Sequence, residues 1–332
     1  MIRTKGLTRE FRVKGTVVEA VKGIDLVVDE GEMVAFLGPN GAGKSTTLRM
    51  LTTLLAPTAG TAEVVGCDVV ANPAAVRQRI GSIGQGNGAG QSQRVRDELV
   101  SQGRCYGLPK AEAVSRTDDL LEGFGLTELA GRVVKTLSGG QRRRLDVALG
   151  LVHRPELLFL DEPSTGLDPQ NRANIAAHIE RLHAEYGTTM VLTTHYLEEA
   201  DRLADRVVII DHGLIIADDS PERLRTSLVG DRLDLHVVNA TDVTQVAAVI
   251  ERLSGTMSVS VDGSAVQARV VGAPAVVPGL LRSLDDSGVE VASVEAIRAT
   301  LDDVFLHLTG RSLREGTDEG ASDDASTEGV AA

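Results

Sequence analysis

The sequence predicts an α/β domain built around a mainly parallel sheet, followed by a smaller α+β domain. Up to about residue 215, short apolar runs alternate with amphipathic helical patterns, which is the layout of a parallel sheet covered by helices. From about residue 231 to 310, the strand-like runs alternate apolar and polar residues instead. The length of 332 residues also exceeds the usual size of one domain, so two domains are expected.

Four nearly continuous apolar runs mark the strands of the first domain. Such runs are typical of strands that are buried on both faces. They are Met33–Leu37, Leu157–Leu160, Met190–Thr193 and Val207–Ile210. Between them, leucines recur at helical spacing at positions 48, 51 and 55, and apolar residues do the same from Leu145 to Val152. We therefore expect two helices that pack on the sheet.

The order of strands and helices expected in the C-terminal part resembles β-α-β-β-α-β. Four of these elements can be placed on the sequence. Strands are expected at Leu233–Val238 and Met257–Val261, and helices at Val243–Leu253 and Val277–Leu284. Residues 311–332 are mostly small or acidic and include no aromatic side chain. Such a segment buries too little apolar surface to offset the entropy of ordering, so we expect a disordered acidic tail.

The composition excludes several classes of function. The formal net charge of −13 and the isoelectric point near 5.0 argue against nucleic acid as a partner, because phosphate binding depends on clustered Lys and Arg. The two cysteines, Cys67 and Cys105, fit a reducing cytoplasm and exclude a zinc site of four cysteines. No stretch approaches the roughly 18 apolar residues that a transmembrane helix needs, so a membrane role requires a separate partner.

A glycine-rich loop follows the first buried run and opens an amphipathic helix. It matches the pattern G-x-x-x-x-G-K-[ST] in the context that this pattern requires. Its glycines let backbone N–H groups converge on phosphate oxygens, Lys44 can reach the β- and γ-phosphates, and the Ser45 hydroxyl can ligate Mg²⁺. The residues expected to hold the nucleotide are Gly38, Pro39, Asn40, Gly41, Ala42, Gly43, Lys44, Ser45 and Thr46. The loop alone does not choose between a kinase, a GTPase, a helicase and a transporter ATPase.

Two adjacent acids end the apolar run Leu157–Leu160. At this place Asp161 can hold the metal ion, and Glu162 can polarise the attacking water. The segment LSGGQ, residues 137–141, stands upstream of these acids and just before a helix. As plain structure it is an N-cap followed by a glycine turn.

Together these segments resemble the ABC ATPase family over about residues 1–220, with GPNGAGKST as Walker A, LSGGQ as the signature and LLFLDEP as Walker B, in the family's order. The resemblance implies a P-loop NTPase fold and an ATPase that uses ATP and Mg²⁺. It implies an ATPase domain at residues 1–225, with a helical signature subdomain at about 86–150. An accessory α+β domain at 231–310 and the acidic tail at 311–332 complete the expected organisation.

The resemblance also implies roles for single residues. Gln85 resembles the Q-loop glutamine that senses Mg²⁺ and the permease, and His195 resembles the switch histidine that contacts the γ-phosphate. Phe11 stands where the family stacks an aromatic ring on adenine, and the structural alternative is a core position in the first strand. Ser164–Asp168 resembles the D-loop, which brings Asp168 to the nucleotide.

The signature implies an active site that is shared between two chains. In the family it contacts the γ-phosphate of ATP held by the Walker A loop of a second copy. Its residues here are Ser138, Gly139, Gly140 and Gln141. The resemblance therefore implies that ATP closes a head-to-tail dimer, that Glu162 activates water, and that the motion drives a partner permease.

Residues 301–310, LDDVFLHLTG, resemble the closing motif of daunorubicin-resistance-type exporter ATPases. As plain structure the segment is an amphipathic helix with Val304, Phe305 and Leu308 at core spacing. The resemblance implies efflux of a drug, antibiotic or lipid-like substrate through a separately encoded membrane permease, with this chain peripheral on the cytoplasmic face of the membrane. Two alternatives stay open: the ATPase of an importer with a regulatory C-terminal domain, and a non-transport ABC ATPase that binds nucleic acid.

Overall fold

The computed structural model describes residues 1–86 and 88–312. The chain forms two compact units that divide between Asp218 and Asp219. This division lies a little before residue 225, where the ATPase domain is expected to end. The expected acidic tail falls, except for its first two residues, outside the described residues. Among the helices of the described part, none is long and apolar enough to cross a bilayer. The prediction of an α/β fold with a smaller α+β domain is confirmed.

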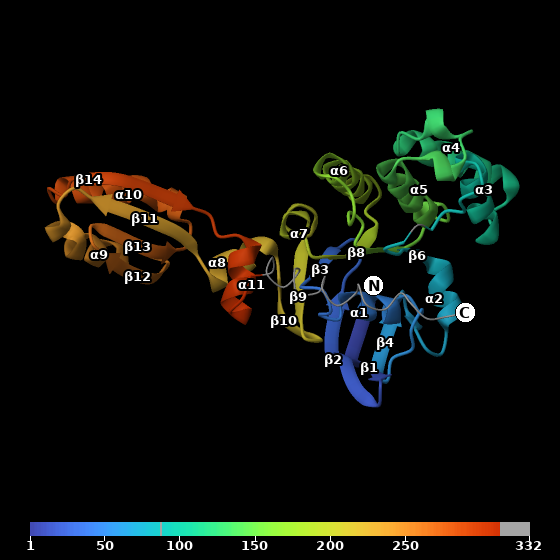
Figure 1. Ribbon diagram of the computed structural model, residues 1–332, viewed down its shortest axis with the longest axis horizontal. Coiled ribbons are helices and arrows are strands. Elements are labelled where there is room, and N and C mark those ends of the chain that lie inside the picture. Colours follow the sequence, from blue (N-terminus) through green and yellow to red (C-terminus); the bar gives the residue numbers. More distant parts are fainter. Residues whose placement is uncertain (87, 313–332) are drawn as a thin grey trace. The chain divides into compact units, whose positions relative to one another are not determined.

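A six-stranded sheet forms the centre of the first unit (Figure 1). Its strand order is β10-β9-β3-β8-β7-β6, and the pairs from β9 to β6 are parallel. All residues of β3, β7 and β8 are buried, which explains the apolar sequences of β3 and β7 and the apolar centre of β8. The strands are β3 (Met33–Leu37), β6 (Ile80–Ile83), β7 (Leu157–Asp161), β8 (Thr189–Thr194), β9 (Arg206–Asp211) and β10 (Leu214–Asp219).

A second, antiparallel sheet has the order β2-β1-β4-β5. One face of this sheet buries Ile2, Leu7 and Ile24 in a core that also contains Phe36 of β3 and Phe159 of β7. The two sheets of the first unit therefore share one hydrophobic core. The strands of the second sheet are β1 (Ile2–Val13), β2 (Thr16–Val28), β4 (Ala59–Val64) and β5 (Cys67–Asp68).

Seven α-helices accompany these sheets in the described part of the first unit. Within the group of helices drawn in green, α3 packs against both α4 and α5 (Figure 1). The α-helices are α1 (Lys44–Leu51), α2 (Pro73–Arg79), α3 (Val95–Cys105), α4 (Lys110–Gly123), α5 (Gly139–Leu151), α6 (Pro169–Tyr186) and α7 (Leu197–Leu203), and the 3₁₀ turns are η1 (Thr127–Leu129) and η2 (Val134–Thr136).

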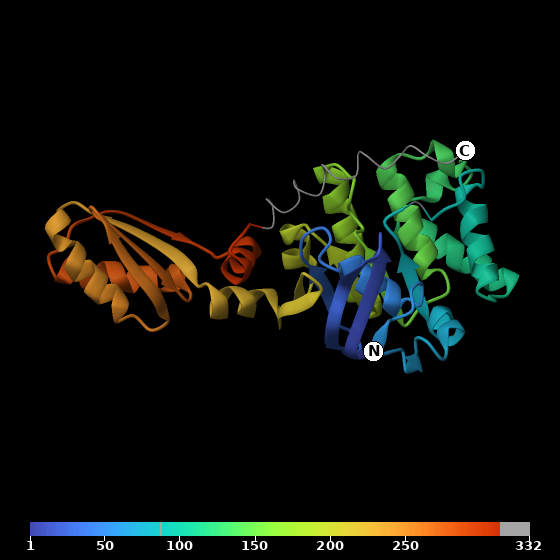
Figure 2. The same ribbon diagram turned by 60° about the horizontal axis from the view of Figure 1, so that its bottom comes forward.

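The second unit contains an antiparallel sheet of order β12-β13-β11-β14. Helices α9 and α10 pack on one face of it (Figures 1 and 2), and the order β11-α9-β12-β13-α10-β14 is the β-α-β-β-α-β order that the sequence predicts. Helix α8 packs against α11 within the same unit. The elements are α8 (Pro221–Leu228), β11 (Asp231–Val237), η3 (Ala240–Asp242), α9 (Val243–Glu251), β12 (Thr256–Asp262), β13 (Ala265–Val270), α10 (Ala273–Asp286), β14 (Val291–Ile297) and α11 (Leu301–Thr309).

Candidate nucleotide-binding site

The glycine-rich loop joins β3 to α1, and two of its glycines are required by close packing. A Cβ atom on Gly38 would lie 2.1 Å from the carbonyl oxygen of Ile210, and one on Gly43 would lie 2.5 Å from that of Ala20. Gly43 also has a φ of 106°, in a region that residues with a side chain rarely adopt. The loop thus ends at the N-terminus of α1, where first-turn N–H groups lack helical partners and attract anions.

Lys44, the first residue of α1, is almost completely buried under this loop. Its Nζ donates hydrogen bonds to the carbonyl oxygens of Gly38 (2.6 Å) and Pro39 (3.0 Å), and the residue is only 4% exposed. Burial lowers the pKa of the Lys44 ammonium, while the nearby charges of Glu162 and Asp161 oppose the decrease. The loop therefore encloses one cation that faces two carboxylates.

Oxygen-bearing side chains from four separate segments converge beside Lys44. The Ser45 hydroxyl donates to Oδ1 of Asp161 (2.8 Å), and Nε2 of Gln85 donates to Ser45 Oγ (3.3 Å). Thr193, at the end of β8, donates from Oγ1 to the same Asp161 oxygen (2.6 Å). Hydroxyl, carboxylate and amide oxygens are ligands that suit Mg²⁺, so this group of side chains fits that ion.

Glu162 and His195 lie side by side at the carboxyl ends of β7 and β8. Nδ1 of His195 is 3.6 Å from Oε2 of Glu162, close enough for an ion pair but longer than a hydrogen bond, and the same oxygen accepts a hydrogen bond from Thr165 Oγ1 (2.9 Å). The imidazole of His195 lowers the pKa of the Glu162 carboxyl, an effect that burial opposes and Thr165 reinforces. Glu162 is therefore an ionised, oriented carboxylate with a histidine beside it.

The backbone of Glu162 is strained. Its φ is 46°, a left-handed conformation that costs a non-glycine residue about 1–2 kcal/mol. The Glu162 N–H donates to both the carbonyl oxygen (3.2 Å) and Oγ1 (3.0 Å) of Thr193. Thr193 thus fixes the conformation of Glu162 as well as the carboxylate of Asp161, and the sequence did not single it out.

Arg143, in α5, is a second residue that the sequence did not single out. It is 8% exposed, and its Nε donates to the carbonyl oxygen of Pro163 (2.6 Å). One terminal nitrogen donates to the carbonyl oxygen of Gly84 (2.8 Å). The other lies 3.3 Å from the carbonyl oxygens of both Asp161 and Glu162. A single guanidinium therefore holds the backbone before Gln85 and the backbone around the two acids.

The predicted signature forms the N-terminus of α5. Ser138 is the N-cap: its Oγ accepts from the Gln141 N–H (3.3 Å), and its own N–H donates to Oε1 of Gln141 (3.0 Å). The side chain of Ser138 is exposed, whereas Gly140 is buried against α6, where a Cβ would lie 2.4 Å from Oδ1 of Asn171. Asp168 caps α6 by accepting from the N–H of Asn171 (2.8 Å). The residue at position 139 is exposed at the first turn.

The predicted site residues thus fall into two groups. No hydrogen bond among the described residues joins the signature or Asp168 to the glycine-rich loop, whereas Lys44, Ser45, Gln85, Asp161, Glu162 and His195 are linked through contacts with one another and with Thr193. Phe11 stands apart in β1, opposite Val18 of β2, half-buried, with the Arg9 guanidinium 4.7 Å from its ring centre. Whether it stacks on adenine stays a prediction.

Known proteins resemble this chain over most of its length. The family profile for ABC transporters matches residues 21–165. The daunorubicin/doxorubicin resistance ATP-binding protein DrrA of Streptomyces peucetius is 43% identical over 328 residues, 97% of this chain and 96% of that protein. A Nod factor export ATP-binding protein I of Ralstonia nicotianae is 37% identical over 320 residues, with 95% of each chain covered.

A solved structure shows the same fold for the first part of the chain. The dimeric structure of MJ0796, a bacterial ABC transporter cassette, matches with a TM-score of 0.61 and 25% identity, and covers 66% of this chain and 98% of that one. The converging Walker residues, the family profile and the relatives agree with one another. The chain therefore belongs to the ABC transporter family, as an ATP-binding subunit of the daunorubicin-resistance type that hydrolyses ATP for a transporter.

Proposed function

We propose that this chain binds MgATP at the glycine-rich loop and hydrolyses it to drive the efflux of a drug, antibiotic or lipid-like compound. The observation that carries the ATPase part is the contact of Ser45 with Asp161 at 2.8 Å, with Glu162 next in the chain. It brings Walker A and Walker B together at one point. Efflux is supported by relatives that are named for drug resistance and for export.

The roles of the residues follow from their positions. Lys44 contacts the β- and γ-phosphates once they replace the loop carbonyls that it now contacts. A magnesium ion would be held by Ser45, Asp161 and Gln85, and it would neutralise charge on the phosphates. Glu162 accepts a proton from the water whose oxygen attacks the γ-phosphorus, and the bond to the leaving ADP oxygen breaks. His195 contacts the γ-phosphate and keeps Glu162 in place.

A second copy of the chain completes the site in this proposal. The exposed Ser138 and the N-terminus of α5 present a hydroxyl and free N–H groups, which favour a phosphate. The two N-termini of α5 and α6 lie together through the contact of Gly140 with Asn171, so Gly139, Gln141 and Asp168 reach the partner's nucleotide as a unit. The arrangement is head to tail, with two ATP molecules between two copies.

The partner of this dimer is a separately encoded integral membrane permease, and the chain lies on the cytoplasmic face of the membrane. Export differs from import in the direction of ATP-driven flux. In inside-out vesicles that contain the chain and the membrane protein that co-purifies with it, we expect ATP to drive substrate into the lumen. ATP-driven loss of preloaded substrate would instead indicate import, and tight binding of DNA or ribosomes without a permease would indicate a non-transport ATPase.

Lys44→Ala is expected to weaken ATP binding by about ten- to a hundredfold, because a buried cation that contacts phosphate contributes about 1.5–3 kcal/mol. Titration with a fluorescent ATP analogue measures the effect. Lys135→Ala, at an exposed position outside the loop, should bind like the native chain. Unchanged affinity in Lys44→Ala would contradict the assignment of this loop as the phosphate site.

Arg143→Gln is expected to lower the rate of hydrolysis more than the affinity for ATP. The shorter amide cannot reach the carbonyl oxygens that Arg143 now holds, so both Gln85 and Glu162 lose their backbone support. A fall in kcat of about tenfold or more is expected, together with a lower melting temperature. Arg144→Gln, one residue along α5, loses contacts only to the segment after α4 and should retain kcat. Equal kcat values for the two variants would contradict a positioning role for Arg143.

A further inference from the structure

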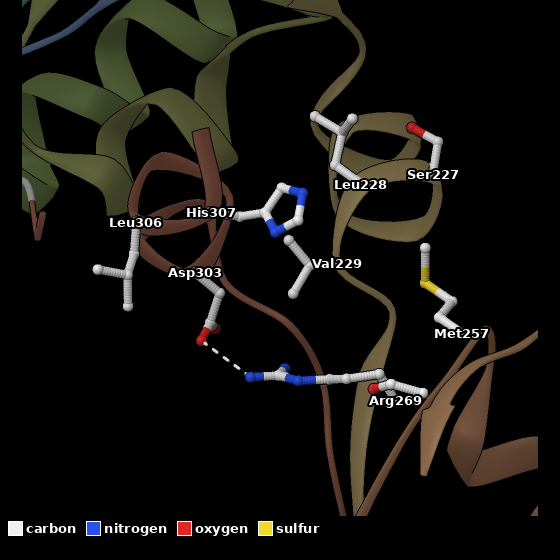
Figure 3. Close-up of a pocket in the computed structure, with 9 residues that line it drawn as sticks. Ser227, Leu228, Val229, Met257, Arg269, Asp303, Leu306 and His307 are labelled. Atoms are coloured by element: carbon white, nitrogen blue, oxygen red, sulfur yellow. Dashed lines mark ion pairs between the residues drawn. The ribbon is translucent and has the colours of Figure 1, made fainter. Parts of the chain in front are cut away.

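A cleft of about 600 Å³ lies within the second unit, between the end of α8, the start of β12, β13 and helix α11 (Figure 3). This volume lies in the range of pockets that bind small molecules. No residue of the predicted nucleotide site contributes to it. Its lining residues are Ser227, Leu228, Val229, Met257, Ser258, Arg269, Asp303, Leu306 and His307.

Arg269 and His307, which line the cleft, make few contacts with other polar groups among the described residues. The Arg269 guanidinium makes one long hydrogen bond, to the carbonyl oxygen of Gly230 (3.4 Å), and one ion pair with Asp303, at 3.7 Å. A guanidinium has five N–H groups, so these contacts use few of them. His307 makes no hydrogen bond or ion pair with the residues that the structure describes, and Figure 3 shows its ring directed toward Val229.

Among the described residues that line the cleft, the one acid is Asp303, and one of its oxygens caps a helix. Oδ2 of Asp303 accepts from the N–H (2.8 Å) and the hydroxyl (2.7 Å) of Thr300, as part of the capping box of α11. Burial raises the pKa of Asp303, but the hydrogen bonds of Thr300 and the charges of Arg269 and Arg232 outweigh it and keep the pKa below its ordinary value. Asp303 therefore stays an acceptor of the helix cap and neutralises Arg269 only partly.

The neighbouring arginine, Arg232, already has an acidic partner and does not line the cleft. Arg232 lies opposite Arg269 in the β11–β13 ladder, but its guanidinium is 2.6 Å from Oδ2 of Asp234. Arg232 is thus paired, while Arg269, with a side chain that is 32% exposed, faces the cleft with long contacts only. An anion with the planar geometry of a carboxylate matches the fork of a guanidinium.

The other wall of the cleft is apolar and partly open. We call Leu228, Val229 and Met257 the apolar wall. Met257 is 45% exposed. Its sulfur lies so close to Gly230 that a Cβ atom on this glycine would be only 2.8 Å from it. Gly230 has a φ of 68°, and the absence of a side chain at this turn leaves room for the methionine sulfur. An apolar body of a ligand would cover this wall and remove it from water.

We propose that this cleft binds a small amphipathic carboxylate, whose anionic group contacts Arg269 and His307 and whose apolar body lies on the apolar wall. The guanidinium supplies the charge and the paired donors, and His307 adds one ring nitrogen. Because all lining residues belong to the second unit, the site does not depend on ATP or on the dimer. The proposal is therefore independent of the proposed function and can fail without affecting it.

The test uses 1-pyrenebutanoate and its uncharged analogue 1-pyrenebutanol with the full chain. The chain contains no tryptophan, so Leu306→Trp, at a lining leucine that is 47% exposed and lies outside the apolar wall, introduces a single donor whose emission the pyrene ring absorbs. We expect saturable, one-site quenching of this variant by pyrenebutanoate. Leu214→Trp, at a similarly exposed leucine of the first unit, should not be quenched at the same concentration. Equal quenching of the two variants would overturn the location.

Two substitutions test the anionic contact by calorimetric titration. Arg269→Gln should bind pyrenebutanoate about ten- to a hundredfold more weakly, as expected for a lost charge-assisted hydrogen bond. His307→Gln changes an exposed position, so the variant should fold like the native chain and bind several-fold more weakly. Arg252→Gln, an exposed arginine at the end of α9, should bind like the native chain. Equal affinity for pyrenebutanol, or native affinity in both Arg269→Gln and His307→Gln, would show apolar adsorption only and refute the proposal.

Discussion

Glu162→Gln is expected to reduce ATP hydrolysis by about 10²–10⁴-fold while leaving ATP binding close to native. A carboxamide has nearly the shape of the carboxylate and keeps the contact with Thr165, but it cannot accept a proton from water. In the proposed dimer, hydrolysis separates the two copies, so ATP should also trap the variant as a dimer. Phosphate release measures the rate, and size-exclusion chromatography with ATP measures the dimer.

The matched control for this variant is Glu156→Gln. Glu156 pairs with Arg79 on the surface, at 2.6 Å, with a side chain that is 44% exposed, so the same chemical change outside the site should leave the rate intact. The His195 imidazole keeps the pKa of Glu162 below its ordinary value of 4.5. Glu162 is therefore ionised at neutral pH, and if it is the base, its protonation should reduce the rate only below that value. A Glu162→Gln variant that hydrolyses ATP at near the native rate would exclude Glu162 as the base.

The parallel sheet could be predicted from the sequence, and the antiparallel sheet beside it could not. Strands β3 and β7 are buried on both faces, so their sequences are continuous apolar runs that stand out. Strand β1 is exposed on one face, and register shifts between Thr4 and Leu7 and between Arg9 and Glu10 interrupt its pairing with β2. These irregularities break the alternation of period two, which is the signal that reveals such a strand.

The site could be predicted where its residues belong to short motifs. Lys44, Ser45 and the two acids carry that signal, whereas Thr193 is the last residue of an apolar run that is read as a strand. Its register opposite Asp161 in the β7–β8 ladder places it in the site, and carboxyl ends of parallel strands meet at one edge. Arg143 has no such signal, because it stands between two other arginines and only the three-dimensional structure shows which of them is buried.

Ser138→Arg is expected to leave ATP binding by the isolated chain intact and to reduce hydrolysis by about 10²–10³-fold. Ser138 is exposed and makes its hydrogen bonds inside α5, so the long cation would not disturb the chain's own glycine-rich loop. It would instead occupy the space into which the partner's γ-phosphate must fit. Nucleotide titration and phosphate release on the same sample separate the two effects.

The substitution also removes a helix cap, a loss of about 1 kcal/mol, and a matched control separates this effect. Ser220 caps α8 with the same side-chain hydrogen bond, since its Oγ accepts from the Arg223 N–H at 3.3 Å, and it belongs to the second unit. Ser220→Arg should lose similar stability and keep its hydrolysis rate. If both variants lost activity equally, the loss in Ser138→Arg would come from the cap and not from a shared site.

Mixing two inactive chains distinguishes a shared site from a site within one chain. A dimer of Ser138→Arg with Lys44→Ala has one intact pair, the glycine-rich loop of the first chain facing the signature of the second. Random mixing makes half of the dimers mixed, so roughly a quarter of the native sites should be restored. If each chain held a complete site, every site in the mixture would carry a substitution and no activity would return. Recovery of hydrolysis on mixing is therefore the result that only a head-to-tail dimer produces.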